Sequence, residues 1–199
     1  MYMNETISTI LKRRSIRAYK PDRVDDESLE LVLEAGRYAP SAMNQQPWHF
    51  TVVRDPALLE KLETSCKTVF LESDVEALRE IARRDDFSVF YRAPALIIVT
   101  GDSTALAPRY DCTLAMQNMM LAAASLGIGS CWMHSIMMLH STEKGKEVFK
   151  ELGISFPEKH VPYAAAVFGY SAMPLPEPEP RKPGTVTIID QDRADSHSA

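Results

Sequence analysis

The segment 110–126 constrains the fold more than any other part of the chain. It has the length of a long helix and carries apolar residues on every side, including Leu114, Met116 and Met119. A helix that is apolar all round has to be enclosed by other elements. Gly127 follows at once and suits the left-handed turn that ends many helices. The sequence therefore predicts a buried helix over this segment.

Other segments predict strands and further helices around it. Residues 95–100 form a continuous apolar run of strand length, which is typical of a strand buried on both faces. Residues 163–170 form a second apolar run, and a third strand is expected at 50–54. Helices are predicted behind Asn4, behind Asp25 or Asp26, from Pro56 to about Ser65, from a capping box at 73–76 to about Arg84, and over 141–152.

Composition limits the class of protein. The chain has 199 residues, of which 45% are hydrophobic, so it can build one sizeable core and we expect one domain. Its formal charge of -5 argues against a broad nucleic-acid-binding surface. Three cysteines without paired spacing argue against a secreted disulfide framework. No apolar stretch is long enough to span a bilayer, so we expect a cytoplasmic protein without nucleic-acid or membrane partners.

A basic cluster at residues 12–19 stands at the end of the first predicted helix. Arg13, Arg14 and Arg17 place three guanidinium groups beside the hydroxyl of Ser15. An arginine fork matches the oxygens of a phosphate, and a serine adds a neutral donor. The same run also fits a solvated surface whose cations suit the negative end of the helix dipole. If it binds a ligand, the acidic overall charge favours a small anion over a general polyanion.

The glycine-containing segment 127–134 matches no familiar catalytic motif. A dinucleotide fingerprint needs a third Gly or Ala where this chain has Trp132, and it needs a strand before the glycines, where this chain has a helix. The nucleophile-elbow pattern around Ser130 also fails. Cys131 and His134 supply at most one pair of metal ligands, whereas structural zinc needs four. No metal site and no nucleophile are predicted.

The C-terminal part of the chain changes in composition. Five prolines between 174 and 183 predict a stiff extended arm that carries Arg181 and Lys182. Residues 185–189 alternate with high β-propensity and have no adjacent hairpin partner, so we expect them to complete a sheet elsewhere, for example in a second subunit. We assign residues 1–190 to a single domain with a variable, partly exposed helical excursion at about 66–92 and the extended arm at 171–190. The polar tail 191–199 is expected to be disordered.

Four motifs occur in the order and spacing of the nitroreductase family, which the chain resembles over nearly its whole length. They are Arg13-Arg14-Ser15-Ile16-Arg17, Pro40-Ser41-Ala42-Met43-Asn44-Gln45-Gln46-Pro47-Trp48, Gly127-Ile128-Gly129-Ser130-Cys131-Trp132, and Phe168-Gly169-Tyr170 followed by Arg181-Lys182. The resemblance implies an α+β fold in which helices wrap a central mixed or antiparallel sheet. It also implies a homodimer that exchanges its C-terminal arms and holds two FMN molecules at the interface.

The resemblance assigns the basic cluster to the FMN phosphate. Arg13 would bind the phosphate with help from Arg14 and Ser15. Arg181 or Lys182 would return from the far end of the chain to the same group. This assignment agrees with the phosphate chemistry that the cluster suggests on its own.

The flavin ring would be held by further residues that the resemblance identifies. Arg17 would lie against the pyrimidine edge, where a positive charge stabilises the negative charge of reduced flavin. A segment of the partner subunit would reach the ring through Pro40, Ser41, Ala42, Met43 and Asn44. Met133 and His134 would place backbone on the ring face or near N5. A basic residue of the excursion would also meet the pyrimidine, with the choice open among Lys67, Arg79, Arg83, Arg84 and Arg92.

The chemistry implied is electron transfer through the flavin. A reduced nicotinamide, NADH or NADPH, would deliver hydride to FMN and leave before a nitroaromatic, quinone or similar small-molecule acceptor takes two electrons, in a ping-pong mechanism. No side chain is nominated as catalytic, because the flavin performs the reaction. Two alternatives stay open. One is a specialised relative with the same FMN site, such as an enone reductase, a dehalogenase or a flavin-degrading enzyme, and the other is a non-catalytic flavin-binding protein.

Overall fold

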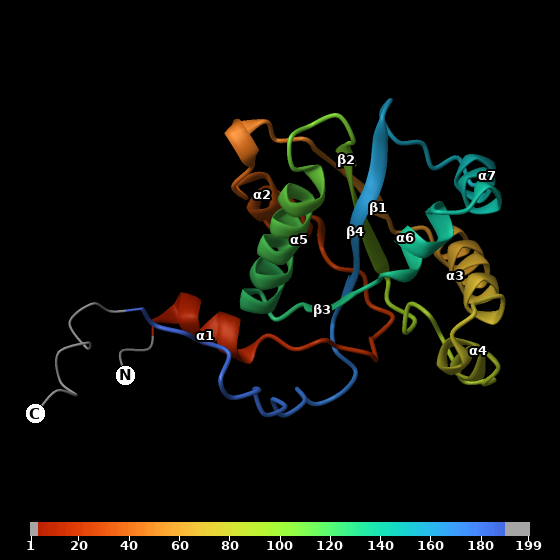
Figure 1. Ribbon diagram of the computed structural model, residues 1–199. Helices are drawn as coiled ribbons and strands as arrows, with labels where there is room; N and C mark the ends of the chain where they lie inside the picture. The colour runs from red at the N-terminus through yellow and green to blue at the C-terminus, as the bar shows by residue number, and fades with distance from the viewer. Residues whose placement is uncertain (1–3, 190–199) are drawn as a thin grey trace, which may run out of the picture.

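The computed structural model describes residues 4–189. A four-stranded antiparallel sheet forms its centre, in the order β1-β2-β4-β3 (Figure 1). The strands are β1 (Trp48–Val53), β2 (Ala95–Asp102), β3 (Gly129–Trp132) and β4 (His160–Gly169). The polar tail predicted at 191–199 lies outside the described residues. The predicted α+β fold with an antiparallel sheet is confirmed.

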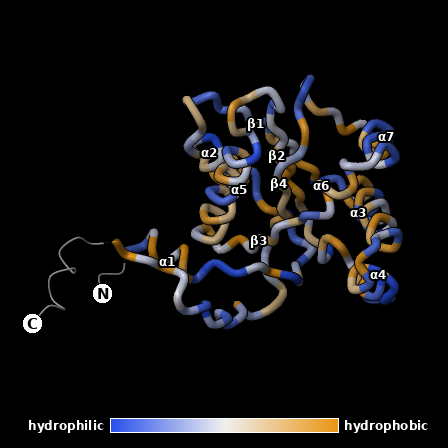
Figure 2. The backbone as a smooth tube through the Cα atoms, in the orientation of Figure 1, coloured by the Kyte–Doolittle hydropathy of each residue, from blue (hydrophilic) through white to orange (hydrophobic). Residues whose placement is uncertain are grey.

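Helices surround this sheet on both sides. Those that the structure describes are α1 (Glu5–Lys12), α2 (Asp26–Arg37), α3 (Pro56–Leu71), α4 (Glu76–Ala82), α5 (Pro108–Ser125), α6 (Ser135–His140) and α7 (Glu143–Glu151), with a short 3-10 helix, η1 (Ala42–Asn44). α2 and α5 cover one face of the sheet, and α3 and α6 cover the other (Figure 1). α4 and α7 lie farther out, and in Figure 2 α7 is coloured largely hydrophilic, whereas α4 carries both hydrophilic and hydrophobic residues.

The two central strands, β2 and β4, are apolar along most of their length. Their register pairs Ile97 with Ala166 and Ile98 with Ala165, and all four side chains are completely buried. Successive residues of a strand point to opposite faces of the sheet. An uninterrupted apolar run therefore requires cover on both faces, and the two helical layers provide it.

Local signals place the ends of several helices. The Asn4 side chain accepts a hydrogen bond from Ile7 N at 2.9 Å and caps α1. Asp25 caps α2 by accepting from Ser28 N at 2.8 Å, and Asp55 caps α3 in the same way. Each of these oxygens satisfies one amide that the first turn of a helix leaves without a partner. Helices are thus confirmed behind Asn4 and Asp25 and at Pro56.

The helix α3 is longer than its prediction. It continues past Ser65 to Leu71. Leu62 and Cys66 are fully buried on its inner face. Because the same face stays in contact with the core, the helix has no reason to end where its sequence becomes more polar.

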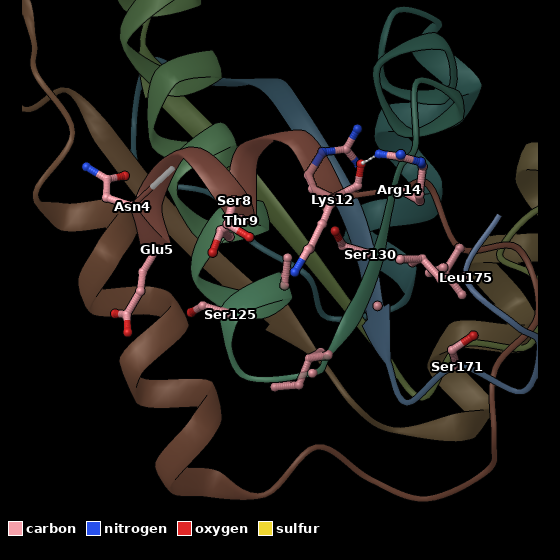
Figure 3. A pocket seen from close by; sticks show the side chains of 16 residues that line it. Asn4, Glu5, Ser8, Thr9, Lys12, Arg14, Ser125, Ser130, Ser171 and Leu175 are labelled. Carbon is pink, nitrogen blue, oxygen red and sulfur yellow. Dashed lines mark hydrogen bonds between the residues drawn. The ribbon is translucent and has the colours of Figure 1, made fainter. Parts of the chain in front are cut away.

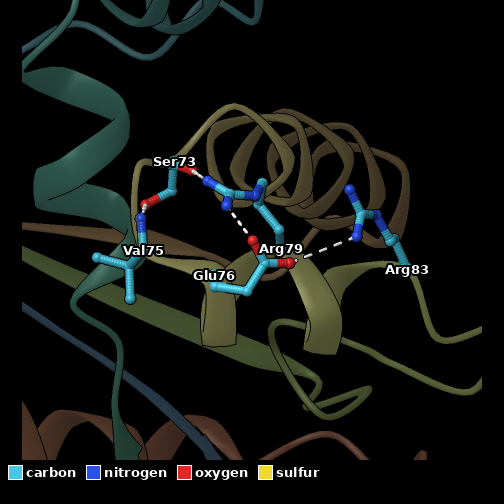
Figure 4. Close-up of polar contacts among 5 residues, drawn as sticks. All are labelled: Ser73, Val75, Glu76, Arg79 and Arg83. Atoms are coloured by element: carbon cyan, nitrogen blue, oxygen red, sulfur yellow. Dashed lines mark hydrogen bonds and ion pairs between the residues drawn. The ribbon is translucent and has the colours of Figure 1, made fainter.

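The capping box predicted at 73–76 does not form. The Ser73 hydroxyl accepts from Val75 N at 3.2 Å, so it closes a local turn and leaves α4 without a side-chain cap. Arg79 instead stabilises this turn, because it donates to the Ser73 carbonyl and to the Glu76 carboxylate (Figure 4). A serine hydroxyl can bond either to the helix or to its own turn, and the sequence does not decide between them.

Apolar residues are exposed on α5 and on the C-terminal arm. On α5, Tyr110 is 72% exposed and Leu114 is 44% exposed, so the prediction of a helix buried on all sides is wrong for this face. Residues 185–189 form no strand within the described part of the chain, and Val186 and Ile188 are exposed.

Within residues 4–189, no helix combines the length and hydrophobicity that crossing a membrane requires.

Candidate functional site

The basic segment 13–17 leaves α1 as extended chain and follows the edge of β3. Ile16 N donates to the Ser130 carbonyl at 3.0 Å, and Ser15 forms a parallel bridge with Ser130. Gly129 permits this close approach, because a Cβ there would lie 2.8 Å from the Ile16 side chain. The arginines are therefore attached to the rigid central sheet.

Successive side chains of this extended segment point to opposite sides. Ile16 is 2% exposed and belongs to the core, whereas Arg13, Ser15 and Arg17 share the opposite parity. Burial raises the pKa of the Cys131 thiol on β3, and Arg17, a hydrogen bond from Ser15 and Arg13 oppose this rise. The structure thus brings three of the predicted phosphate and pyrimidine residues together beside one thiol.

The surroundings of Arg13 favour a bound anion. Burial lowers the pKa of its guanidinium, and the nearby charges of Arg14 and Arg181 lower it further. Its Nη1 atom is buried and has no hydrogen-bond partner within residues 4–189. Leaving a buried donor unpaired costs about 1–3 kcal/mol, and more for a charged group. A phosphate would satisfy this donor and neutralise the repulsion, so the residues present fit such a group.

A pocket of about 770 Å³ opens beside this segment, between α1, the end of α5 and the start of β3. In Figure 3, Lys12 extends from the end of α1 beside Ser130, and Arg14, Ser171 and Leu175 lie on the side of the arm. Apolar side chains and the Glu5 carboxylate line part of the wall, and hydroxyl and cationic groups line another part. That chemistry suits an anion that also carries hydroxyl groups.

Arg14 differs from Arg13 in how its donors are used. Its Nη1 donates to the carbonyls of Leu11 at 2.7 Å and Arg13 at 2.9 Å. Its Nε donates to the Pro176 carbonyl at 3.1 Å. Arg14 therefore fastens the C-terminal arm to the end of α1, and Figure 1 shows the arm passing beside this helix. Its charge reaches the ligand region, but these donors are occupied.

The predicted segment of Pro40, Ser41, Ala42, Met43 and Asn44 forms a projecting loop. Met43 has φ of 51° and Asn44 has φ of 54°, and the Met43 side chain is 86% exposed. Backbone in this left-handed region costs a non-glycine residue on the order of 1–3 kcal/mol. Such conformations persist where surrounding contacts impose them, and they are frequent at binding sites.

Asp111 of α5 is one of those contacts, and sequence reasoning missed it. Its Oδ1 accepts from Ala42 N at 3.1 Å, and the residue is 3% exposed. Ser41 Oγ accepts from Gln46 N at 3.0 Å and closes the loop from within. The signal in the sequence was a carboxylate near the start of a largely apolar helix, where burial requires a hydrogen-bonding reason.

The two predicted groups lie at opposite ends of α5. Ala42 contacts the first turn of this helix through Asp111. Arg13 and Ser125 line the same pocket at its last turn. The axial rise from residue 111 to residue 125 is about 20 Å, at 1.5 Å per residue. A single chain therefore does not bring the loop 40–44 to the arginines.

Met133 and His134 follow β3 directly and differ from each other in environment. Met133 is buried, and its N donates to the Ala165 carbonyl at 2.8 Å. His134 is exposed at the start of α6. Together with Trp132, His134 lines a separate groove of about 920 Å³. The Met133 side chain is therefore hidden from solvent, whereas His134 is accessible.

Acidic neighbours engage most of the basic candidates in the excursion. Glu76 pairs with Arg79 and Arg83, and Asp86 pairs with Arg84. Arg92 makes no side-chain hydrogen bond or ion pair within residues 4–189. In the same part of the chain no group of three His, Cys, Asp or Glu residues is placed to hold a metal ion.

The family model described as nitroreductase family matches residues 10–170. The chain belongs to the nitroreductase family. The resemblance carried by the four sequence motifs is thereby confirmed, and the family's model spans all the described strands and helices except α1, of which it covers the last turn.

Similar proteins within this family include both sequences and solved structures. A nitroreductase with bound FMN from Bacteroides fragilis NCTC 9343 superposes with a TM-score of 0.85 at 38% identity, covering 94% of this chain and all of that one. A second FMN-bound nitroreductase, from Desulfitobacterium hafniense DCB-2, has a TM-score of 0.83 at 30% identity, covering 95% and 100%. A protein of Archaeoglobus fulgidus, provisionally named NADH dehydrogenase/NAD(P)H nitroreductase, is 34% identical over 84% of this chain and 86% of its own.

Proposed function

We propose that the chain is an FMN-dependent oxidoreductase that takes hydride from NADH or NADPH and passes two electrons to a nitroaromatic, quinone or related acceptor in a ping-pong mechanism. The observation that carries the proposal is the buried, unpaired Nη1 of Arg13 beside the cations of Arg14 and Arg181. The FMN-bound relatives support the choice of anion. The phosphate of FMN has the charge and the acceptor oxygens that this cluster needs.

The chain's own residues would hold the cofactor and set its electrostatic environment. Arg13 and Ser15 would bind the phosphate together with Arg181 or Lys182. Arg17 would place a fixed positive charge against the pyrimidine edge, where it favours the reduced form. When bound, FMN would supply the redox chemistry itself, by exchanging electrons with donor and acceptor in turn.

A second copy of the chain would supply the rest of the site. The loop 40–44 does not reach the arginines of its own chain, because about 20 Å of α5 separates them. In a symmetric dimer each loop would instead meet the cofactor held by the other subunit. Ile7, Ile10 and Leu11 on α1 are 41% to 56% exposed, as is Leu114 at 44% on α5. These exposed apolar residues support a contact with another copy of the chain.

The C-terminal arm would extend the interface. Val186 is 77% exposed and Ile188 is 81% exposed, so both apolar side chains are available for contact with a partner. In the described sheet β1 pairs with β2 alone, so its outer edge is open. We propose that residues 185–189 pair with that edge in the partner subunit. Arg14 would hold the beginning of the arm through Pro176.

An anaerobic absorbance spectrum tests the function directly. The purified protein is incubated with FMN, desalted, and measured before and after addition of NADH or NADPH, and then after a quinone or nitroaromatic acceptor. We expect retained flavin that bleaches with the nicotinamide and regains its colour with the acceptor. Retained flavin that neither nicotinamide reduces would reject the oxidoreductase and favour a flavin-binding protein. A lack of retained flavin would reject the cofactor assignment.

A further inference from the structure

We propose that Asp111 is a positioning residue of the site, which holds the loop 41–44 in the strained conformation that presents Met43 and Asn44 to the cofactor of the other subunit. The part of this inference that concerns the cofactor rests on the proposed function. The part that concerns the loop rests on the contacts of a single chain.

The first step is the contact itself. Asp111 Oδ1 accepts from Ala42 N at 3.1 Å, immediately before the left-handed residues Met43 and Asn44. Asp111 lies on α5, whose Met116 is completely buried against the sheet. The carboxylate is thus held by a rigid element, while the backbone that it binds belongs to a projecting loop. A support of this kind can fix a loop that its own conformation would not.

The second step is that the other hydrogen bonds between the loop and the elements around it lie toward its C-terminal end. Gln45 Oε1 accepts from Leu106 N at 2.9 Å in an exposed contact. Pro47 O accepts from Asp102 N at 3.0 Å. The hydrogen bonds from Asn44 N to the Ser41 carbonyl and from Gln46 N to Ser41 Oγ close the turn from within, and they do not attach it to another element. The Asp111 contact is partly buried, and it attaches the N-terminal side of the loop to α5, so it fixes the direction in which the tip of the loop projects.

The third step is that stability alone does not explain a carboxylate at this position. Asp111 is 3% exposed, and its Oδ2 is buried without a hydrogen-bond partner within residues 4–189. No ion pair to Asp111 is present in that part of the chain. Burying an acidic group without a counter-ion is unfavourable, and an apolar residue of similar volume is often tolerated better. The helix N-terminus offsets only part of this penalty.

The experiment compares two substitutions of similar size. Asp111→Asn keeps an oxygen that can accept from Ala42 N, and Asp111→Leu fills the space without an acceptor. Asn118→Leu is the matched control, because Asn118 also lies on α5 and its Nδ2 donates to a backbone carbonyl outside the loop, that of Ala35 on α2 at 3.0 Å. Each protein is examined first by amide hydrogen exchange without FMN, and then by FMN titration.

In Asp111→Leu we expect the amides of residues 42–46 to exchange about tenfold faster or more, because a local opening has become easier. We expect the Kd for FMN to rise by about tenfold, and we expect Asp111→Asn to restore both values to near wild type. In Asn118→Leu, faster exchange should be confined to α2 and α5. Thermal midpoints show whether a variant is merely less stable.

Native exchange of residues 42–46 in Asp111→Leu would overturn the positioning role. Faster exchange with an unchanged affinity for FMN would overturn the link to the cofactor while leaving the proposed function intact. Failure of Asp111→Asn to restore the loop would also overturn the inference, because its amide oxygen is the acceptor that the argument requires. A wild-type protein that binds no FMN would reject both the proposed function and this link.

Discussion

Arg13 combines two features that an isolated surface arginine lacks. One of its nitrogens is buried without a partner in the described residues, and two further guanidinium groups, of Arg14 and Arg181, act on it. Arg181 comes from the opposite end of the chain, so folding itself creates the repulsion. A protein that gathers like charges around an unpaired donor is less stable than it could be, unless a bound anion offsets the cost.

Replacing Arg13 by Ala should therefore weaken FMN binding more than it weakens the fold. We expect a loss of about 1.5–3 kcal/mol in binding free energy, the range for hydrogen bonds to charged groups. A fluorescence titration of the apoprotein with FMN measures it. Arg37→Ala is the control, because Arg37 is an arginine of α2 that pairs with Glu30 and Glu34 away from the pocket. Equal affinities for the Arg13 variant and the wild type would reject the phosphate role.

At the scale of elements, α6 and α7 are joined by a small aromatic cluster. His140 ends α6, and its ring lies 5.7 Å from that of Phe149 on α7 and 5.8 Å from that of Phe156. Burial lowers the pKa of His140, and the charge of Lys146 lowers it further. The folded protein therefore favours the neutral imidazole, even though the end of a helix would favour the cation.

This shift predicts a pH dependence of stability. As the pH falls through about 6.5, the ordinary value for histidine, the unfolded chain takes up the proton before the folded one. Stability should therefore fall between neutral pH and the folded pKa, and no further below it on account of this group. His140→Phe keeps a ring and cannot titrate, so its thermal midpoint should fall less between pH 7.5 and 5.5.

The comparison isolates His140 because other titrating groups are shared by the two proteins. Burial also lowers the pKa of His160, which should produce a similar fall in both. Parallel midpoints for the wild type and His140→Phe across this range would show that the histidine does not contribute. A steeper fall of the thermal midpoint in the variant would contradict the predicted direction of the pH dependence.

Elements whose signals are local could be predicted from the sequence. The apolar runs of β2 and β4 and the caps at Asn4, Asp25 and Asp55 depend on neighbouring residues, and they appear in the structure. The exposed face of α5 could not be predicted. The sequence shows that Leu114 is apolar, but it does not show whether its own chain or another chain covers it. The capping box predicted at 73–76 was wrong because the Ser73 hydroxyl can bond either to the helix or to its own turn, and the sequence does not decide between these two hydrogen bonds.

The residues of the candidate site also differ in whether the sequence could reveal them. The basic run at 13–17 could be found because arginine and serine indicate anion binding wherever they cluster. The difference between Arg13 and Arg14 could not, since it depends on where the carbonyl of Pro176 lies after folding. Asp111 was passed over because its partner, Ala42 N, is a backbone group, and backbone groups have no sequence signature.

At the scale of the whole molecule, the fold separates residues that the proposed function needs together. The arginine segment lies at the C-terminal end of α5 and the loop 40–44 at its N-terminal end. A rigid helix cannot bend to join them. A twofold symmetric dimer solves the problem, because an isologous interface brings one end of each chain to the other end of its partner. The unpartnered apolar residues of α1 and the arm lie where such contacts would be useful.

Complementation between two defective chains tests this arrangement. One chain carries Arg13→Ala, and the other carries Ser41→Ala with Asn44→Ala. Each homodimer has the same defect in both of its sites, so both should bind FMN weakly. In a heterodimer, isolated through two different affinity tags, one site combines the wild-type arginine of one chain with the wild-type loop of the other. We expect that site to bind FMN with wild-type affinity, at a stoichiometry of about one per dimer, because the second site carries both defects.

The opposite architecture gives a different stoichiometry and a different affinity. If each site were built from one chain, every site of the heterodimer would retain a single defect, and no tight binding would reappear. Tags exchanged between the two chains provide the control for the purification. Restored binding, together with bleaching of the flavin by NADH or NADPH, would show that the arginine of one subunit and the loop of the other act on the same cofactor. This arrangement is the one expected from their positions at opposite ends of α5.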